Sequence, residues 1–168
     1  QPNWNYPRTV TAQANDAVYF SDSLAEDLCR RDLTVNAMAM DRRGVLTDLH
    51  GGREDLRRGL LRCVGEPDRR FDEDALRIMR TLRFASVLGF TVEERTAAAL
   101  HRRAPLLGSI AAERLLSEMD RLLCGRYVLP VLPYFEPPGV LPVFVYSVLR
   151  YSVFPMLLPV LLLHLKLQ

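Results

Sequence analysis

Acidic and arginine side chains cluster at the start of a helix predicted within residues 65–89, GEPDRRFDEDALRIMRTLRFASVLG. At about 100° per residue, Glu73, Arg77 and Arg80 share one side of this helix, and Asp74 lies on the flank next to Arg77. A carboxylate beside a guanidinium sets a hydrogen-bond acceptor next to donors, which suits a binding site. The same side chains could instead form a solvated face with ion pairs three or four residues apart. This segment alone leaves both interpretations open.

The opposite side of this helix is predicted to face the core. Its apolar and small residues fall on one narrow stripe: Ala75, Ile78, Met79, Leu82, Ala85 and Ser86. Further along, the side that carries the arginines becomes apolar again at Phe84 and Leu88. The helix is therefore expected to be buried on both sides except at its N-terminal half, where the acids and arginines lie.

Short elements are predicted before this helix. Ser23 and Glu26 form a capping-box pattern for a short helix through Cys29. A turn at residues 41–44 allows the next four residues to pair back on the preceding segment as a hairpin. Residues 53–58 form a short charged helix, and the stretch from Leu60 to Val64 is a strand or an extended connection.

Helices are predicted after it. Gly89 suits the end of the first helix; Thr91 is expected to cap a second through Arg103, and Ser109 to cap a third that ends at Gly125. The core face of the third helix is marked by an apolar stripe: Ala111, Leu115, Met119 and Leu122. The fold class is α+β, with short strands and a hairpin followed by a helical segment.

Composition narrows the class of protein. The 168 residues suit one domain or two small ones. Lys166 is the only lysine among the 22 lysines and arginines. This predominance of arginine favours contacts to phosphates and base edges, or it reflects a GC-rich genome. Three widely spaced cysteines indicate free thiols in a reducing compartment, so a cytoplasmic location is expected, and they argue against a zinc site or a disulfide framework. The N-terminal residues read as a truncated start and not as a signal peptide.

The residues after Arg126 are apolar and rich in proline. Arg150 interrupts the run, and insertion of an arginine near the bilayer centre costs about 2.5–3.5 kcal/mol. Three interpretations stay open: a membrane segment, a buried extension, or a tail that is not native coding sequence. The structure of this segment is left uncertain, and membrane contact is expected only if the tail is native.

Three patterns occur in order along the chain. They are EDLCRRDLTVNAMA at 26–39, then Asp41, Gly44 and Asp48 followed by GGR at 51–53, then EDALRIMRTLRFA at 73–85. Together they closely resemble motifs B, C and D of the class II tRNA nucleotidyltransferases (CCA-adding enzymes) and the related bacterial poly(A) polymerases. Leu33 replaces the Phe of motif B, and residues 112–118 resemble the start of motif E. The likeness covers roughly residues 18–125.

The motif D chemistry agrees with what the resemblance implies. On its pairing edge, cytosine or adenine offers an amino donor beside a ring-nitrogen acceptor, so the Asp74 carboxylate and Arg77 guanidinium, placed on one helix, would match either base. Guanine and uracil reverse this order. A good bidentate pair discriminates by about 1–3 kcal/mol. One protein pair could thus select CTP and ATP.

The resemblance implies further roles. Glu73 would orient Arg77, and Arg80 would add a contact to nucleotide or to structure. Arg31 and Asp32 would contact the ribose and phosphates, with Asn36 supporting their loop. The motif C hinge would let the head move against the neck and consists of Asp41, Gly44 and Asp48, with Gly51 and Gly52 nearby. Ordinary turn glycines remain an alternative at these positions.

The family's catalytic metal site has no counterpart in the motifs found. In-line attack of an RNA 3′-hydroxyl on the α-phosphate uses Mg²⁺ held by an Asp-x-Asp before motif B, and nothing before Arg30 supplies it. No catalytic or metal-binding residue is therefore assigned in this chain, which is expected to be inactive alone.

The resulting assignment is a fragment of a nucleotidyltransferase. Residues 1–64 would be the end of the head domain, residues 65–126 the helical, nucleotide-recognising neck, and residues 127–168 the apolar tail. The expected function is CCA addition to the tRNA 3′ end from CTP and ATP, with no obligate protein partner. Poly(A) addition, a non-catalytic arginine-rich RNA-binding module and a membrane-associated protein are the alternatives.

Overall fold

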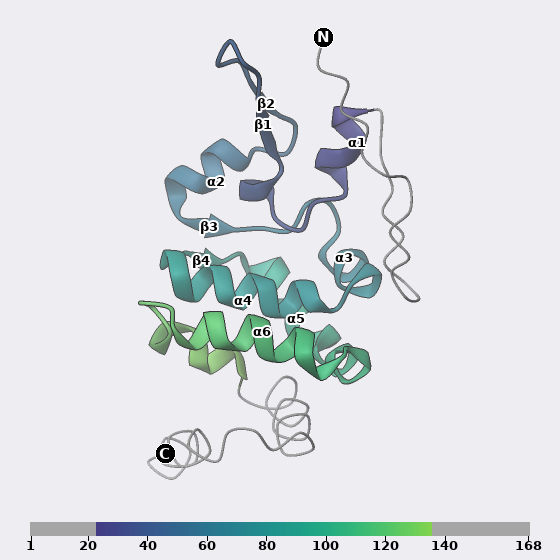
Figure 1. Ribbon diagram of the computed structural model, residues 1–168, viewed down its shortest axis with the longest axis vertical. Helices are drawn as coiled ribbons and strands as arrows, with labels where there is room; N and C mark the ends of the chain where they lie inside the picture. Colours follow the sequence, from purple (N-terminus) through teal and green to yellow (C-terminus); the bar gives the residue numbers. More distant parts are fainter. Residues whose placement is uncertain (1–22, 136–168) are drawn as a thin grey trace.

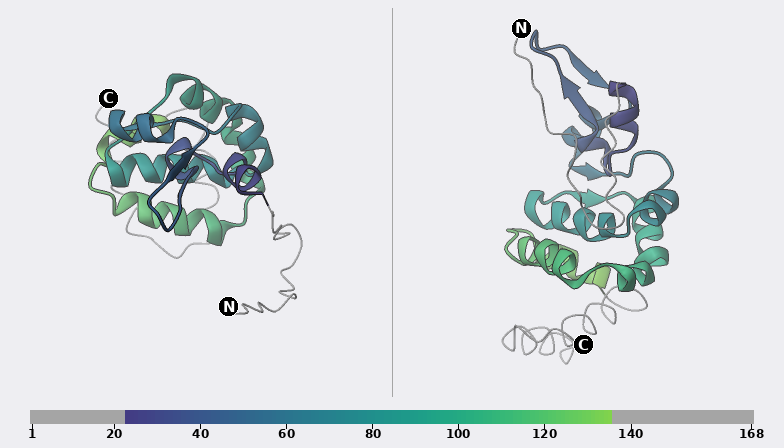
Figure 2. Two further views of the ribbon diagram at one scale, coloured as in Figure 1. Left: turned by 90° about the horizontal axis from the view of Figure 1, so that it is seen from above. Right: turned by 45° about the vertical axis from the view of Figure 1, so that its right-hand side comes forward.

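The computed structural model describes residues 23–135, which form two stacked parts (Figure 1). The N-terminal part contains a hairpin and two short helices, and the C-terminal part is a set of packed helices. Figure 2 shows the hairpin at one end of the described chain and α6 near the other. The hairpin in the N-terminal part and the packed helices in the C-terminal part match the predicted α+β class.

The N-terminal part begins as predicted. Helix α1 (Leu24–Cys29) is capped by Ser23, whose hydroxyl accepts from the Glu26 N–H at 3.5 Å. A 3-10 turn, η1 (Thr34–Asn36), leads into the antiparallel hairpin of β1 (Met38–Met40) and β2 (Leu46–Asp48).

The next elements follow directly. Helix α2 (Gly52–Arg58) and strand β3 (Leu60–Leu61) lie where a charged helix and an extended segment were predicted. Gly52 is required here by packing, because a Cβ at this position would collide with the Thr34 carbonyl. The start of α2 is thereby pressed against η1.

The helix predicted within residues 65–89 ends before Gly89 as expected, but it starts later than predicted, because Asp72, Glu73 and Asp74 were expected at its start. The structure has two helices, α3 (Pro67–Glu73) and α4 (Leu76–Leu88), separated at Asp74, whose φ of −154° and ψ of 104° are extended. The Asp74 carboxylate accepts from the Leu76 N–H at 3.0 Å, so the side chain competes with helical hydrogen bonding at this point. The predicted core stripe of α4 is confirmed, since Ile78, Met79 and its other members are all buried.

Two predicted helix caps are also wrong. Thr91 lies in β4 (Thr91–Val92), which pairs in parallel with β3, and Glu93 instead caps α5 (Glu94–Arg103) by accepting from the Thr96 N–H at 3.2 Å. The segment after α5 is a 3-10 helix, η2 (Ala104–Ser109), so Ser109 ends that turn and does not cap the next helix.

Helix α6 (Ala112–Leu123) packs along α4 and completes the core. Leu115, Met119 and Leu122 are buried as predicted, although Ala112 takes the place of the exposed Ala111. Gly125 lets α6 end close to α4, because a Cβ there would overlap Ser86.

The first part of the expected apolar tail packs against the helices. Within η3 (Leu129–Phe135), Val131 and Phe135 are buried in the same core as α4 and α6. Residues 136–168, and with them most of the tail and Arg150, lie outside the described residues. Among the helices of residues 23–135, none is long and apolar enough to cross a membrane.

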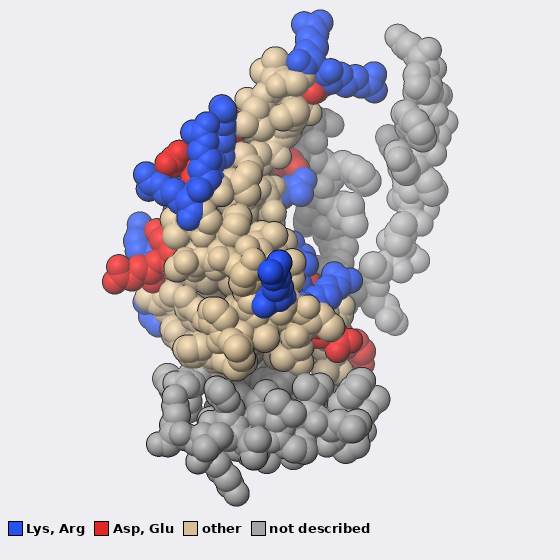
Figure 3. Space-filling model, turned by 90° about the vertical axis from the view of Figure 1, so that its left-hand side faces the viewer, with Lys and Arg blue, Asp and Glu red and all other residues tan. Residues whose placement is uncertain are grey.

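Arginines project from the upper part of the face that carries α2 (Figure 3). The exposed arginines of the hairpin turn and of α2 are Arg42, Arg43, Arg53, Arg57 and Arg58. Two of them pair with Glu54 along α2, at 3.6 and 2.9 Å. Exposed pairs of this kind contribute little to stability, so this surface is an ordinary solvated face as far as folding is concerned.

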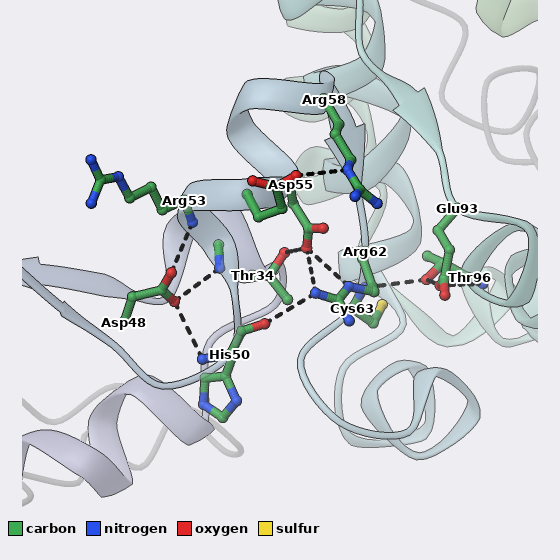
Figure 4. Close-up of polar contacts among 12 residues, drawn as sticks. Thr34, Asp48, His50, Arg53, Asp55, Arg58, Arg62, Cys63, Glu93 and Thr96 are labelled. Carbon is green, nitrogen blue, oxygen red and sulfur yellow. Dashed lines mark hydrogen bonds and ion pairs between the residues drawn. The ribbon is translucent and has the colours of Figure 1, made fainter.

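A polar network joins the N-terminal part to the helices (Figure 4). The buried carboxylate of Asp55 accepts from the Thr34 hydroxyl at 2.6 Å and from Arg62 Nε at 2.9 Å. One residue along, the Cys63 N–H donates to the Thr96 hydroxyl at 3.2 Å. The loop after α1, strand β3 and helix α5 are thus fixed to one another.

Asp32 provides a second connection between the two parts. Its carboxylate accepts from Arg80 Nε on α4 at 2.8 Å, from the Leu33 N–H at 2.9 Å and from Asn36 Nδ2 at 3.3 Å. Only 7% of the Asp32 side chain is exposed. Burial alone would raise the pKa of Asp32, but the Arg80 charge and the three hydrogen bonds outweigh it, and the pKa lies below the ordinary 3.8.

We predict that Asp32→Asn destabilises the fold in a pH-dependent way. A carboxyl whose pKa is lowered by folding stabilises the protein above its unfolded pKa, and this contribution is lost as the pH falls through the folded pKa. At pH 7 the variant should lose about 1.5–3 kcal/mol of unfolding free energy, the usual contribution of a hydrogen bond to a charged group. Urea unfolding at a series of pH values measures this.

The difference between wild type and Asp32→Asn should shrink below about pH 3.8, the ordinary value for this group. Asp120→Asn, an exposed change on α6, serves as the control and should leave stability nearly unchanged. A difference that stays constant down to pH 2.5 would contradict the assigned role of the Asp32 carboxylate.

Candidate functional site

A polar pocket of about 450 Å³ lies where the loop after α1 meets the first turns of α4 and α6. Its lining is dominated by charged side chains: Arg30, Arg31, Asp32, Asn36, Asp74, Leu76, Arg77, Arg80 and Arg114. Five arginines against two aspartates give this lining a formal excess of three positive charges. Such a pocket favours an anionic ligand.

The structure brings the predicted nucleotide-binding residues together. All five line the pocket, namely Arg31, Asp32, Asp74, Arg77 and Arg80, as does the supporting Asn36. Arg30, Leu76 and Arg114 also line it but were not predicted. Their positions follow from how α1, α4 and α6 pack, which local sequence patterns do not specify.

Arg77 is held in place on the pocket wall by three protein acceptors. Its Nη1 donates to Glu73 Oε2 at 2.9 Å and to the Arg70 carbonyl at 3.2 Å, and its Nη2 donates to the Arg30 carbonyl at 3.0 Å. Glu73 also accepts from Arg70 at 2.8 Å. The contact between Glu73 and Arg77 is the one that the resemblance implies.

Asp74 reaches the pocket from the break between α3 and α4. The sequence placed it with Arg77 on one continuous helix, and the extended backbone at residue 74 removes that geometry. Its Oδ1 accepts from the Leu76 N–H at 3.0 Å, and its Oδ2 lies 3.7 Å from Arg114 Nη2. Asp74 and Arg77 therefore share a pocket without bonding to each other's side chains.

Arg80 and Arg31 differ in how much of their guanidinium is occupied. Arg80 uses Nε for Asp32, and its guanidinium lies 5.9 Å from the centre of the Phe84 ring, but within residues 23–135 its Nη groups have no hydrogen-bond acceptor. Arg31 donates to Asp27 from Nε at 3.2 Å and from Nη2 at 2.7 Å, and half of its side chain is exposed. Arg80 is thus the freer donor toward a ligand.

The predicted hinge residues lie outside the pocket. Asp41 accepts from the Arg43 and Val45 N–H groups in the hairpin turn, both at 2.8 Å, and Gly44 in that turn has a φ of 81°. Asp48 accepts from the N–H group of His50 and from the N–H groups of the first two residues of α2. Burial would raise the pKa of Asp48, but these backbone hydrogen bonds outweigh it and lower the pKa.

The segment resembling motif E lies on α6, which packs against the pocket-lining helix α4. Glu118 on α6 is buried and lies 2.6 Å from Arg83 Nε on α4. The Arg83 guanidinium also lies over the Phe84 ring, 4.1 Å from its centre. This ion pair fixes α6 against α4, and Arg114 projects toward the pocket from the first turn of α6.

A metal site is not formed by residues 23–135, where no group of three or more His, Cys, Asp or Glu side chains could hold an ion. The two carboxylates that line the pocket both face arginines. Mg²⁺, which the resemblance implies, therefore does not fit these residues. All three cysteines are free, as predicted.

Comparison with known proteins gives consistent matches. The family described as "Poly A polymerase head domain" matches residues 6–62, and that described as "Probable RNA and SrmB- binding site of polymerase A" matches residues 89–133. The CCA-adding enzyme of Geobacillus kaustophilus (strain HTA426) is 48% identical over 124 residues, which are 74% of this chain. The chain spans 31% of the length of that curated relative.

Solved structures agree with the sequence matches. The Bacillus stearothermophilus CCA-adding enzyme in complex with CTP has a TM-score of 0.70 at 49% identity, over 72% of this chain and 31% of that one. A tRNA nucleotidyltransferase complexed with a primer tRNA and an incoming ATP analogue has a TM-score of 0.60 at 36% identity, over 67% of this chain and 34% of that one.

These relatives share both sequence and fold with about two thirds to three quarters of this chain. The chain belongs to the family of class II tRNA nucleotidyltransferases (CCA-adding enzymes) and bacterial poly(A) polymerases.

Proposed function

We propose that this pocket binds CTP or ATP and selects the base during CCA addition to the 3′ end of tRNA. The observation that carries the proposal is the meeting of the motif B and motif D side chains in one arginine-rich pocket. The relatives reported above are CCA-adding enzymes, one solved with CTP. They favour CCA addition over poly(A) addition.

Base selection would rest on Asp74 and Arg77. The Asp74 carboxylate is anchored through one oxygen by the Leu76 N–H, which leaves Oδ2 to accept from the amino group of cytosine or adenine. The Nη groups of Arg77 are held by Glu73 and by two backbone carbonyls. A guanidinium fixed in this way would present its remaining N–H to the ring nitrogen of the same base.

The triphosphate would lie among the other arginines. The Nη groups of Arg80 point to no acceptor among the described residues and suit a phosphate or ribose oxygen. Arg31 would add charge from the exposed rim. The Asp32 carboxylate already accepts from three protein donors, so we assign it chiefly to orienting Arg80.

The wider assignment follows the same resemblance. We propose that residues 1–64 act as part of a head and residues 65–126 as a neck, with the turns at Gly44 and Asp48 allowing movement between base additions. The tRNA 3′ end would be the RNA partner, as in the neighbour solved with primer tRNA. We place the protein in the cytoplasm, where its three free thiols would stay reduced.

We predict that Asp74→Ala removes the preference for CTP over GTP. Loss of the acceptor for the cytosine amino group, and of its clash with the guanine carbonyl, should reduce the ratio of the two dissociation constants by about 1–3 kcal/mol, or roughly fivefold to 150-fold. Titration calorimetry of the chain with each nucleotide measures the ratio.

The control is Asp72→Ala, which removes an aspartate two residues away that pairs with Arg103 at 3.1 Å and does not line the pocket. Its CTP-to-GTP ratio should equal that of the wild type. An unchanged ratio in Asp74→Ala would refute the assignment of base selection to Asp74.

We further propose that the 168-residue chain binds nucleotide without transferring it. Transfer in this family requires carboxylates in an Asp-x-Asp before motif B, and residues 1–30 contain no such pair. Labelled CMP or AMP should therefore not appear in tRNA that lacks its CCA end. Detectable incorporation that survives further purification would overturn this proposal and leave the binding assignment standing.

A further inference from the structure

Five exposed arginines lie on one face of the chain, away from the pocket. They belong to the hairpin turn and to α2, and together they are called the arginine surface: Arg42, Arg43, Arg53, Arg57 and Arg58. None of them lines the pocket. In Figure 1, α2 lies on one side of the molecule, whereas α1, whose following loop lines the pocket, lies on the other. Figure 3 shows basic side chains projecting from the face that carries α2.

The backbone beneath the arginine surface is fixed by side-chain hydrogen bonds. In the hairpin turn, the Asp41 carboxylate accepts from two backbone N–H groups, both at 2.8 Å. At the start of α2, the Asp48 carboxylate accepts from the Arg53 N–H at 2.9 Å. The Arg53 side chain itself points away from this contact and from the network around Asp55 (Figure 4). The turn and the helix thus hold their arginines outward.

The acids of these segments face other groups more than they face the arginine surface. Asp41 and Asp48 accept from backbone N–H groups, and the buried Asp55 pairs with Arg62 at 2.8 Å. None of these three carboxylates forms an ion pair with the arginine surface in the described structure. Their charge therefore does not hold the exposed guanidinium groups in place.

Glu54 is the acid that pairs with the arginine surface. Within residues 23–135 it lies 3.6 Å from Arg57 and 2.9 Å from Arg58, and both arginines remain exposed, by 62% and 68% of their side chains. The three other arginines have no side-chain acceptor among the described residues: Arg42, Arg43 and Arg53. Most guanidinium groups of this face are thus available to a partner.

This distribution of charge suits an extended polyanion. With Asp41, Asp48 and Glu54 counted, the five arginines still leave a formal excess of two positive charges. The guanidinium fork donates two parallel hydrogen bonds to phosphate oxygens. The arginines extend from the hairpin turn to the last turn of α2 and do not converge on a pocket, so they match a chain of phosphates better than a single nucleotide.

RNA is the polyanion that the similar proteins favour. The arginine surface lies within residues 6–62, the range that matches the family described as "Poly A polymerase head domain". One of the solved neighbours is complexed with a primer tRNA. An anionic membrane attracts the same charges, so vesicles are included in the test.

We infer that the arginine surface is an RNA contact separate from the nucleotide pocket, and that it binds backbone phosphates independently of sequence. The inference goes beyond the proposed function, which concerns selection of the base in the pocket. Phosphate contacts position an RNA without reading its bases. The affinity that they supply is electrostatic and falls steeply as the salt concentration rises.

The test measures binding of a labelled tRNA transcript that lacks its CCA end, at about 0.05–0.2 M salt. The variant Arg42→Gln/Arg43→Gln/Arg53→Gln breaks no ion pair of the described structure. Its slope of log K against log salt concentration should be smaller by about two to three, since each lost phosphate contact removes about 0.7–0.9. An unrelated single-stranded RNA should show a similar loss. CTP affinity and melting temperature should stay at their wild-type values.

Two controls separate the arginine surface from net charge. The corresponding triple lysine variant keeps the charge and should retain most of the slope. Arg95→Gln/Arg102→Gln/Arg121→Gln makes the same change in net charge on α5 and α6. Arg95 and Arg102 already pair with Glu66 and Asp68, so the slope should fall by less than about one.

An unchanged slope in the glutamine variant of the arginine surface would overturn the inference. An equal loss in the variant of α5 and α6 would also overturn it, because net charge would then account for the effect. Binding of the wild type to vesicles of phosphatidylglycerol and phosphatidylcholine, without binding to either RNA, would identify a membrane surface instead. Should the triple glutamine variant not fold, Arg42→Gln/Arg43→Gln decides, with an expected loss of about 1.5 in slope.

This inference and the proposed function fail separately. A chain that binds RNA through the arginine surface but does not bind CTP would contradict the pocket assignment alone. A chain that prefers CTP to GTP, while its glutamine variant binds RNA as the wild type does, would contradict the arginine surface alone.

Discussion

The pocket depends on a buried carboxylate that accepts from both parts of the chain. Asp32 accepts from Asn36 and the Leu33 N–H in its own loop and from Arg80 on α4. An unpaired charge in this position would be strongly unfavourable, so the loop and the helix must stay together. This constraint places the motif B loop opposite the break that carries Asp74.

Each of three arginines in the site forms an ion pair with a different acidic residue. Glu73 holds Arg77, Asp27 holds Arg31, and Asp32 holds Arg80. Each pairing fixes one guanidinium while leaving N–H groups for a ligand. An excess of positive charge can therefore face the pocket without the arginines repelling one another into solvent, which suits a triphosphate bound beside a base.

The sequence predicted the contents of the site better than its geometry. Motif spacing predicted Asp74, Arg77 and Arg80 as nucleotide-binding residues, and all three line the pocket. Helical periodicity predicted the buried face of α4. The break at Asp74 was missed because helical periodicity continues through it, whereas a side-chain hydrogen bond to the Leu76 N–H decides the backbone there. Arg114 was missed because its place in the pocket depends on how α6 packs on α4.

The helix caps show the same limit. Thr91 is a preferred cap by residue type, but it pairs in parallel with β3 as part of β4, and Glu93 caps α5 instead. Ser23, by contrast, was predicted correctly, because its capping hydrogen bond from the Glu26 N–H is made three residues along the same chain segment. The cap of α1 thus follows from local sequence, whereas the cap of α5 depends on strand pairing between segments far apart in the chain.

The central claim is that a base lies between Asp74 and Arg77, and a crystal structure of this chain with bound CTP tests it most directly. We predict the cytosine amino group within hydrogen-bond distance of Asp74 Oδ2 and its ring nitrogen facing Arg77, with the phosphates toward Arg80. A cytosine ring turned away from both side chains, or CTP bound outside the pocket, would contradict the account.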